Sequence, residues 1–269
     1  KDKYMHTKNL VSIIMTCHNG EDYLNEAINS IVNQKFKEWE LIFYDNYSND
    51  KSKEIVNAYN DKRIKYFRTN KLLNLGEIRN AAYTKTNGEF ITFLDVDDTW
   101  NEEKLYSQIR KFKQNENIDI IYCDYKKFSL DNNNIKKKNQ NFAKGFCQEE
   151  IINSYIDGAP ITPWLTLMIK KKQIAKLEYA FDKRLHIASD FDLIIRLSRF
   201  CYFDYVPEVL CNYRIHQSNT SSNKKKELSE LSYILHKYNN DQKIKKIFRR
   251  NFFSTKVKIK NFLSKFIKY

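Results

Sequence analysis

The sequence predicts an α/β protein whose central sheet is mostly parallel and carries helices on both faces. Short apolar runs of β-branched and aromatic residues alternate four times with amphipathic stretches over roughly the first 95 residues. Such alternation is typical of βαβ units, which build parallel sheets covered by helices. Aspartates directly follow two of these runs, at the strand ends where open α/β sheets bind ligands. Only five glycines and three prolines are present, so we expect few flexible linkers.

Each element of this first part is predicted from its own pattern. Short apolar runs predict strands at Val11–Met15, Trp39–Tyr44, Ile64–Arg68 and Phe90–Leu94. The first helix is indicated by apolar residues at positions i, i+3, i+4, i+7 and i+8, namely Leu24, Ala27, Ile28, Ile31 and Val32. A second helix presents Ile55, Val56 and Tyr59 on one face, and a third spans Leu75–Thr86.

The second part of the chain has a less regular pattern. Helices are expected from about Asn101 to Lys113, near Glu149–Tyr155 and from about Asp190 to Phe200. Strands are expected at Ile118–Cys123, Leu165–Ile169 and Val209–Tyr213, and a polar, lysine-rich loop at Asp131–Asn141. We therefore expect one domain over residues 1–222 and a separate helical segment over residues 223–269.

Cysteine usage and hydropathy indicate a cytoplasmic protein. The five cysteines are scattered and form no C-x-x-C pair, which argues against a disulfide framework and a structural zinc site. No apolar run approaches the roughly 18 residues of a membrane-spanning helix. The opening segment Lys1–His6 lacks the apolar core of a signal peptide.

The positive charge is concentrated at the C-terminal end. Residues 224–269 hold 14 lysines and arginines against three acids, which accounts for +11 of the net charge of +14. From Ile244 to Ile267, apolar residues alternate with basic ones at roughly helical spacing. We interpret this segment as a helix that binds an anionic membrane surface. A helix packed on the domain and a nucleic-acid-binding patch are the alternatives.

The segment Gly88–Asp98 carries the clearest chemical signal. Its apolar run ends in three aspartates, Asp95, Asp97 and Asp98, within four residues. A buried strand that delivers three carboxylates to its tip requires a cation there. Carboxylates are hard ligands for Mg²⁺ or Mn²⁺, and such metals usually also hold substrate phosphates. A solvated acidic turn before a helix is the alternative.

A second acidic turn begins at Asp45. Its carboxylate suits a nucleobase N–H or a ribose hydroxyl, while the first turn would hold the metal on a diphosphate. The sequence contains neither G-x-G-x-x-G nor a Walker A motif, so metal and basic side chains must neutralise the phosphates. Arg79 is a candidate for this role, and a helix-surface ion pair is its alternative.

Several motifs follow one another in a known order. They are V-S-I-I-M-T-C-H-N-G (Val11–Gly20), Y-D-N-Y-S-N-D (Tyr44–Asp50), N-L-G-E-I-R-N-A (Asn74–Ala81), G-E-F-I-T-F-L-D-V-D-D-T-W (Gly88–Trp100), S-D-F-D-L (Ser189–Leu193) and Y-R-I-H (Tyr213–His216). Together they resemble family 2 glycosyltransferases of the GT-A fold over roughly Leu10–Ser222. The resemblance implies a Rossmann-like sheet and inverting sugar transfer from a UDP-sugar, assisted by Mn²⁺ or Mg²⁺. Residues 10–100 would be the nucleotide-sugar half and residues 101–222 the acceptor half.

The resemblance also implies roles for single residues. By position, Thr16, His18 and Asp45 would contact the nucleobase and ribose, and Asp95 and Asp97 would form the metal-binding Asp-x-Asp. Asp98 would bind donor sugar hydroxyls or orient a water on the metal. Asp190 falls where the family places its catalytic base, although Ser189 precedes it where glutamate is more usual.

A base is required on chemical grounds as well. In a single displacement at the anomeric carbon, the acceptor hydroxyl loses its proton as the diphosphate leaves, and a nearby carboxylate can accept it. Asp192 is the rival of Asp190. Two residues apart at a helix start, these side chains point in different directions, so only one should face the cleft. The alternative for both is stabilisation of the helix N-terminus.

Three more residues are assigned to the site. His216 suits a metal ligand or a donor to the departing diphosphate, and a structural histidine is its alternative. Trp164 is assigned to the acceptor side, where its ring would stack on a sugar, whereas Trp100 is assigned to the core. Asp192 is placed on the acceptor side with Trp164 if it is not the base.

We therefore expect a bacterial glycosyltransferase that moves a hexose or N-acetylhexosamine to a hydroxyl of a membrane-linked glycan, such as a lipid-linked oligosaccharide or lipooligosaccharide. It would lie on the cytoplasmic face of the inner membrane, with its tail on anionic lipid. A sugar nucleotidyltransferase is one alternative, but it would favour a glycine-rich phosphate loop. A nucleic-acid-binding protein is the other. It would not need clustered carboxylates, which repel phosphate, so no nucleic-acid partner is expected.

Overall fold

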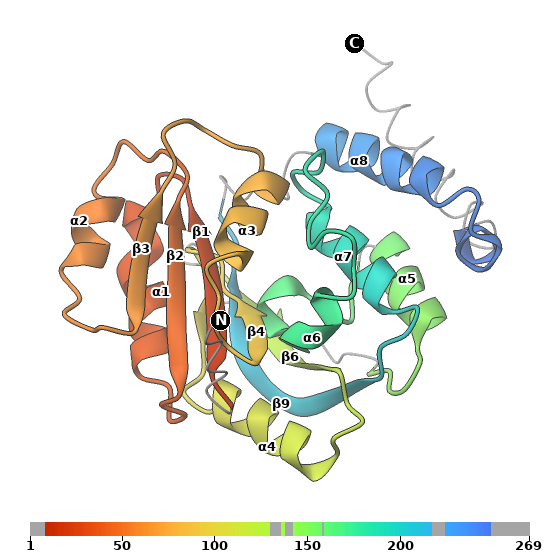
Figure 1. Cartoon of the computed structure of the whole chain (residues 1–269), viewed down its shortest axis with the longest axis horizontal. Coiled ribbons are helices and arrows are strands. Elements are labelled where there is room, and N and C mark those ends of the chain that lie inside the picture. Colours follow the sequence, from red (N-terminus) through yellow and green to blue (C-terminus); the bar gives the residue numbers. More distant parts are fainter. Residues whose placement is uncertain (1–8, 130–135, 138–141, 158, 217–223, 249–269) are drawn as a thin grey trace, which may run out of the picture.

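The computed structural model describes residues 9–129, 136–137, 142–157, 159–216 and 224–248, and these form an α/β fold (Figure 1). The strands are β1 (Val11–Cys17), β2 (Trp39–Asp45), β3 (Ile64–Arg68), β4 (Phe90–Phe93), β5 (Thr99–Trp100), β6 (Ile120–Phe128), β7 (Lys136–Lys137), β8 (Met168–Lys170) and β9 (Phe203–Arg214). The helices are α1 (Glu21–Val32), α2 (Ser52–Asn57), α3 (Leu75–Tyr83), α4 (Lys104–Gln114), α5 (Gln148–Ile156), α6 (Lys171–Ile174), α7 (Ser189–Leu197) and α8 (Lys224–Lys237).

The described strands form one sheet in the order β3-β2-β1-β4-β8-β6-β9-β5, with β7 paired to β6. The β3, β2, β1 and β4 strands are parallel to their neighbours, as the sequence predicts for βαβ units. Beyond them the sheet is mixed. The short β8 is antiparallel to both β4 and β6, whereas β6 and β9 are parallel. The carboxyl ends of β1, β2 and β4 therefore lie at one edge, which is the predicted location of the site.

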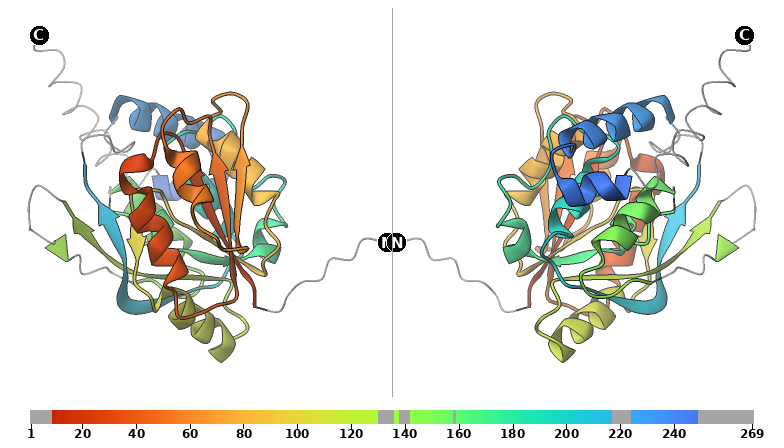
Figure 2. Two further views of the ribbon diagram at one scale, coloured as in Figure 1. Left: turned by 90° about the vertical axis from the view of Figure 1, so that its left-hand side faces the viewer. Right: turned by 90° about the vertical axis from the view of Figure 1, so that its right-hand side faces the viewer.

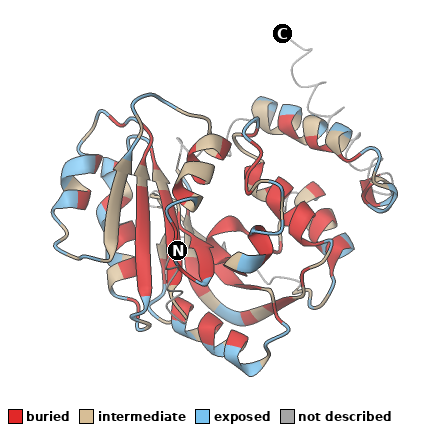
Figure 3. Ribbon diagram, viewed as in Figure 1, coloured by how far each residue is buried: buried red, intermediate tan, exposed pale blue. Residues whose placement is uncertain are grey.

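Helices cover both faces of the sheet, and α8 packs outside the helical layer that contains α5 and α7 (Figures 1 and 3). Buried residues of α1, α2 and α4 pack on one face. Those of α3, α5, α6 and α7 pack on the other. The predicted fold class is thus confirmed, because strands such as β1 present apolar side chains to both helical layers.

The structure differs from the sequence prediction at short elements. Instead of a strand over Leu165–Ile169, a 3₁₀ turn at Trp164–Thr166 precedes the three-residue β8. Its cause is local, because the backbone N–H and the hydroxyl of Thr166 both donate to the Pro163 carbonyl. The strand predicted at Val209–Tyr213 is the end of the twelve-residue β9. The β7 strand lies within the predicted polar loop.

The C-terminal segment packs on the domain as far as the structure describes it (Figure 2). Ile234 and Tyr238 in and after α8 join a core cluster with Ile152 of α5 and Ile195 of α7. Three apolar residues of the predicted membrane-binding stretch, Ile244, Ile247 and Phe248, are buried in the same cluster. Packing on the domain, one of the alternatives for this segment, therefore holds up to Phe248. Residues 249–269 lie outside the described part of the chain.

Within the described residues, no helix is both long and apolar enough to cross a membrane.

The packing between α4 and the sheet gives a stability prediction. Leu105 is fully buried in the core, whereas Leu72 is 58% exposed. Leu105→Ala should lower the free energy of unfolding by about 2–5 kcal/mol, because it leaves a cavity that the close-packed core fills only partly. Leu72→Ala should change it by less than about 0.5 kcal/mol. Denaturant titration of both variants checks this, and equal losses would show that α4 is not packed as described.

Candidate active site

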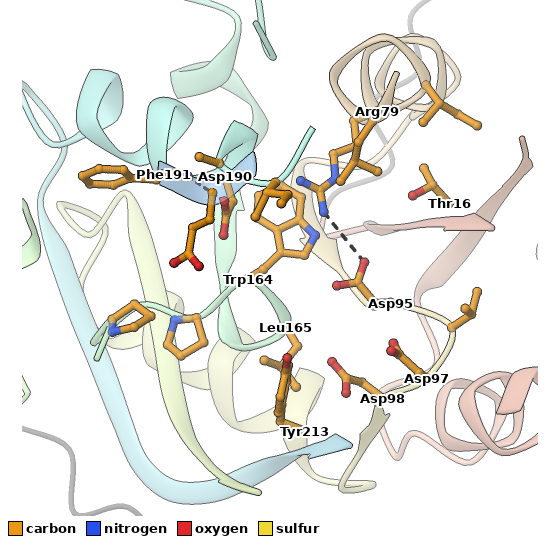
Figure 4. A pocket seen from close by; sticks show the side chains of 18 of the residues that line it. Thr16, Arg79, Asp95, Asp97, Asp98, Trp164, Leu165, Asp190, Phe191 and Tyr213 are labelled. Carbon is orange, nitrogen blue, oxygen red and sulfur yellow. Dashed lines mark hydrogen bonds and ion pairs between the residues drawn. The ribbon is translucent and has the colours of Figure 1, made fainter. Parts of the chain in front are cut away.

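A cleft of about 640 Å³ opens at the carboxyl edge of the parallel strands (Figure 4). One wall comes from residues after β1 and β4, and the opposite wall from α5, the start of α7 and α8. The lining includes eight residues predicted from the sequence, namely Thr16, His18, Arg79, Asp95, Asp97, Asp98, Trp164 and Asp190. Residues from distant parts of the sequence thus meet in one cavity.

The three aspartates that follow β4 lie together at one side of the cleft (Figure 4). The side chain of Asp95 is 43% exposed, whereas Asp98 is buried. Partial removal from water raises the pKa of Asp95 to about 6, while Arg79 lowers it and the charge of Asp97 raises it. Burial, followed by the charges of Asp97 and Asp95, raises the pKa of Asp98 well above its usual range. The mutual repulsion of these groups favours a cation among them.

The β9 strand braces this acidic turn. Asp98 accepts a hydrogen bond from the backbone N–H of Arg214 at 2.9 Å, and the Arg214 side chain donates to the Asp97 carbonyl at 2.8 Å. His216 follows directly, with its Nε2 at 2.9 Å from Oδ2 of Asp97. The sequence could not show this contact between distant residues, although the Y-R-I-H motif (Tyr213–His216) contains the histidine that makes it.

The chemistry of this acidic turn suits a hard divalent cation. Mg²⁺ and Mn²⁺ take carboxylate oxygens, and Mg²⁺ is usually held by one or two protein carboxylates with water and substrate phosphate completing the shell. Among the residues that the structure describes, no three His, Cys, Asp or Glu side chains form a complete metal-binding group. Asp95 and Asp97, with His216 beside Asp97, are therefore residues that fit a site completed by substrate.

Arg79 links the two walls of the cleft. Its guanidinium donates to the Ser189 hydroxyl at 2.6 Å, lies 3.8 Å from an oxygen of Asp95 and stacks 4.4 Å from the centroid of Trp164. Gly76 lets α3, which carries Arg79, pack closely against the backbone at Asp182, because a side chain at position 76 would clash with the Asp182 carbonyl. The buried Arg79 therefore contacts Asp95 and the start of α7 rather than forming the surface ion pair considered as its alternative.

Asp190 faces the acidic turn from the opposite wall (Figure 4). It belongs to the first turn of α7, and one of its oxygens accepts the Phe191 N–H at 2.8 Å. Burial raises the pKa of Asp190, and the nearby Arg79 opposes this shift. A carboxylate in such a position is suited to accept a proton near neutral pH.

Asp192 does not line the cleft, so the structure gives no support to its predicted acceptor-side role. The α7 helix turns its side chain into the interior, where it is fully buried. One oxygen accepts from Arg196 at 3.0 Å, and the other accepts from Lys237 and from Tyr238, the latter at 2.7 Å. These partners compensate the buried charge, so Asp192 fastens α8 to α7.

Asp45 also lies outside the lining of the cleft. Its fully buried carboxylate accepts from the Ser48 N–H at 2.8 Å and from the Tyr66 hydroxyl at 2.6 Å, with Arg68 at 3.3 Å. These bonds hold the turn after β2, so the structure gives no support to the predicted contact with ribose. Thr16 and His18 do line the cleft, and His18 contacts the Asn46 carbonyl at 2.9 Å.

Trp164, predicted for the acceptor side, borders the cleft and stacks on Phe93 with a centroid distance of 3.6 Å. The same wall includes residues that the sequence did not reveal. Tyr155 of α5, Lys127 of β6 and Glu227 of α8 line it as well. No motif marks these three, because their helices and strands bring them to the cleft only in the folded chain. Trp100 is buried in the core, as predicted.

Comparisons with known proteins agree with the family that the sequence motifs predict. A profile described as glycosyl transferase family 2 matches residues 12–177. An uncharacterized glycosyltransferase of Methanocaldococcus jannaschii is 34% identical over 256 residues, covering 93% of this chain and 85% of the relative. The chain therefore belongs to glycosyl transferase family 2, as the sequence motifs predicted, and is an enzyme of the glycosyltransferase class.

Other relatives and solved structures extend the comparison. Escherichia coli WfgD, named a UDP-Glc:alpha-D-GlcNAc-diphosphoundecaprenol beta-1,3-glucosyltransferase, is 29% identical over 81% of this chain and 82% of its own length. The S. aureus TarS fragment 1–349 in complex with UDP-GlcNAc has a TM-score of 0.65 at 21% identity, over 80% of this chain and 61% of that one. PcManGT from Pyrobaculum calidifontis, in complex with GDP-Man and Mn²⁺, has a TM-score of 0.64 at 13% identity, over 88% and 67%. These structural likenesses establish a shared fold.

Proposed function

We propose that this chain is an inverting, metal-dependent glycosyltransferase that moves a hexose or N-acetylhexosamine from a UDP-sugar to a hydroxyl of a lipid-linked glycan. The observation that carries the proposal is that the acidic turn after β4 and Asp190 border the same cleft from opposite walls. The printed activity of WfgD supports a UDP-sugar donor and a lipid-linked acceptor. The UDP-GlcNAc complex of TarS supports the donor class.

In this proposal the donor binds along the edge formed by β1 and β4. Thr16 and His18 would contact the nucleoside, and Asp98 would contact donor sugar hydroxyls. Asp95 and Asp97 would hold Mn²⁺ or Mg²⁺, with His216 beside them, and the ion would neutralise the departing diphosphate when bound. Arg79 would orient Asp95 and supply positive charge near the phosphates.

The acceptor would enter beside Tyr155 and Trp164. Asp190 would take the proton from its attacking hydroxyl while the bond from the anomeric carbon to the diphosphate breaks. Because attack and departure occur on opposite faces of that carbon, one displacement inverts its configuration. Residues 10–100 would thus form the nucleotide-sugar half and residues 101–222 the acceptor half.

A donor assay tests this function. The purified chain should release UDP from UDP-glucose or UDP-GlcNAc in the presence of Mn²⁺, faster with GlcNAc-diphosphoundecaprenol as acceptor, and chelation with EDTA should suppress the release. NMR of the product should show the inverted anomer. Absence of both UDP binding and UDP release from every UDP-sugar tried would refute the proposal. Family membership favours sugar transfer over the nucleotidyltransferase and nucleic-acid alternatives.

We also propose that residues 249–269 bind the anionic cytoplasmic face of the inner membrane. This stretch holds seven lysines and arginines, no acid and several phenylalanines. A chain that ends at Phe248 keeps the packed apolar residues Ile244 and Ile247. It should therefore lose sedimentation with phosphatidylglycerol vesicles while still releasing UDP from the donor. Equal sedimentation of both forms would contradict the membrane role.

A further inference from the structure

A buried carboxylate of α8 binds the segment that leads into α7. Glu230, which is 6% exposed, accepts hydrogen bonds from three successive backbone N–H groups. One oxygen accepts from His186 at 3.0 Å, and the other accepts from Ile187 at 2.8 Å and Ala188 at 2.9 Å. Hydrogen bonds to a charged acceptor are roughly twice as strong as neutral ones, so this arrangement fixes the local backbone.

The segment that Glu230 holds is part of the cleft. Ile187 and Ala188 line it, and Asp190 follows two residues later. Ala188 is the N-cap of α7 and provides no side-chain hydrogen bond to the helix. The N-cap residue therefore does not fix the entry into α7, and Glu230 holds this backbone from a helix some 40 residues away.

The α8 helix that carries Glu230 is itself attached to the domain. Lys237, two turns further along α8, bonds Asp182 at 2.9 Å and also bonds Asp192. Asp182 precedes the held segment and Asp192 follows it, so α8 is attached on both sides of Asp190. Glu227 and Leu231, the neighbours of Glu230 on α8, line the cleft directly.

We propose that Glu230 is a positioning residue for sugar transfer: it holds the backbone of residues 186–188 so that Asp190 faces the reacting hydroxyl. This inference rests on the proposed role of Asp190 as the base. Glu230 does not contact the substrate in this role. It acts because displacement of a catalytic group by about 1 Å can cost about 10²-fold in rate.

Variants of Glu230 test this inference in the full chain. With UDP-glucose and Mn²⁺, Glu230→Ala should lower kcat for UDP release by about 10²-fold, while KM for UDP-glucose and the affinity for UDP stay at wild-type values. Glu230→Gln should lose less, because its carbonyl oxygen still accepts from part of the segment. Glu178→Gln is the matched control, since Glu178 is exposed and lies away from the cleft.

A loss of stability alone has to be separated from loss of positioning. Leu105→Ala weakens the core without touching this segment, so well below its melting temperature it should keep the wild-type kcat. A wild-type kcat in Glu230→Ala would overturn the inference. So would a loss of kcat that only matches the fraction of unfolded protein.

Amide hydrogen exchange tests the same contact without any turnover. The N–H groups of His186, Ile187 and Ala188 should exchange faster in Glu230→Ala than in the wild type, and unchanged exchange would overturn the inference. If the wild type releases no UDP from any donor, the proposed function fails. Faster exchange would then still support Glu230 as the group that holds this segment.

Discussion

Asp190→Asn is expected to lower kcat for sugar transfer by about 10²- to 10⁴-fold, the usual contribution of a general base. Asparagine keeps the size of the side chain but cannot accept the proton of the acceptor hydroxyl. Affinity for UDP and Mn²⁺ should stay unchanged, because Asp190 lies on the wall opposite the acidic turn. Steady-state kinetics and calorimetry with UDP measure the two effects separately.

Asp22→Asn is the control for this variant, since Asp22 is an exposed residue of α1 that does not line the cleft. Burial raises the pKa of Asp190, so kcat of the wild type should fall with decreasing pH at values above the usual range of an aspartate. Above that pKa the carboxylate is ionised and kcat should be constant. Normal turnover in Asp190→Asn would exclude this residue as the base.

Asp97→Asn is expected to abolish the contribution of metal to UDP binding. Loss of a residue that only hydrogen-bonds a metal ligand typically costs about 10- to 100-fold in metal affinity. Loss of a carboxylate that binds the metal directly should cost at least as much. The variant with Mn²⁺ should therefore bind UDP no better than the wild type does in EDTA. Isothermal calorimetry of UDP, with and without Mn²⁺, measures both values.

Asp119→Asn provides the comparison for Asp97, because Asp119 directly precedes β6 and does not border the cleft. Its UDP binding should keep the full response to Mn²⁺. Metal-enhanced UDP binding in Asp97→Asn equal to that of the wild type would rule out Asp97 as a ligand.

The parallel half of the fold could be predicted because β1, β2 and β4 are buried apolar runs closed by polar turns. In that half, a single helix joins β1 to its neighbour β2, and another joins β2 to β3. The mixed half was harder to predict. The β5 and β7 strands are two residues long and show no periodicity. The β8 strand enters the sheet through a 3₁₀ turn set by Pro163 and Thr166.

For the site, residue type and motif order predicted most of the side chains that meet at the cleft, but not the orientation of each. The direction of Asp192 depends on Lys237 and Tyr238, which are far along the chain and were assigned to a separate segment. Asp45 is likewise engaged by the Tyr66 hydroxyl and by the Ser48 N–H of its own turn; the sequence predicted the turn but not these hydrogen bonds. Burial of a charge is decided by partners distant in sequence, and periodicity does not report them.

The bonds between α8 and residues 182–192 have a consequence for protein engineering. One way to exchange acceptor preference between relatives is to transplant the wall of the cleft that contains Asp190. If only that wall is transplanted, Glu230 is separated from the amides it holds and Lys237 from its two aspartates. Both helices would need to be grafted together as one cassette. For the same reason, the smallest fragment that folds with the Asp190 wall of the cleft intact should extend through Phe248 instead of stopping near residue 222.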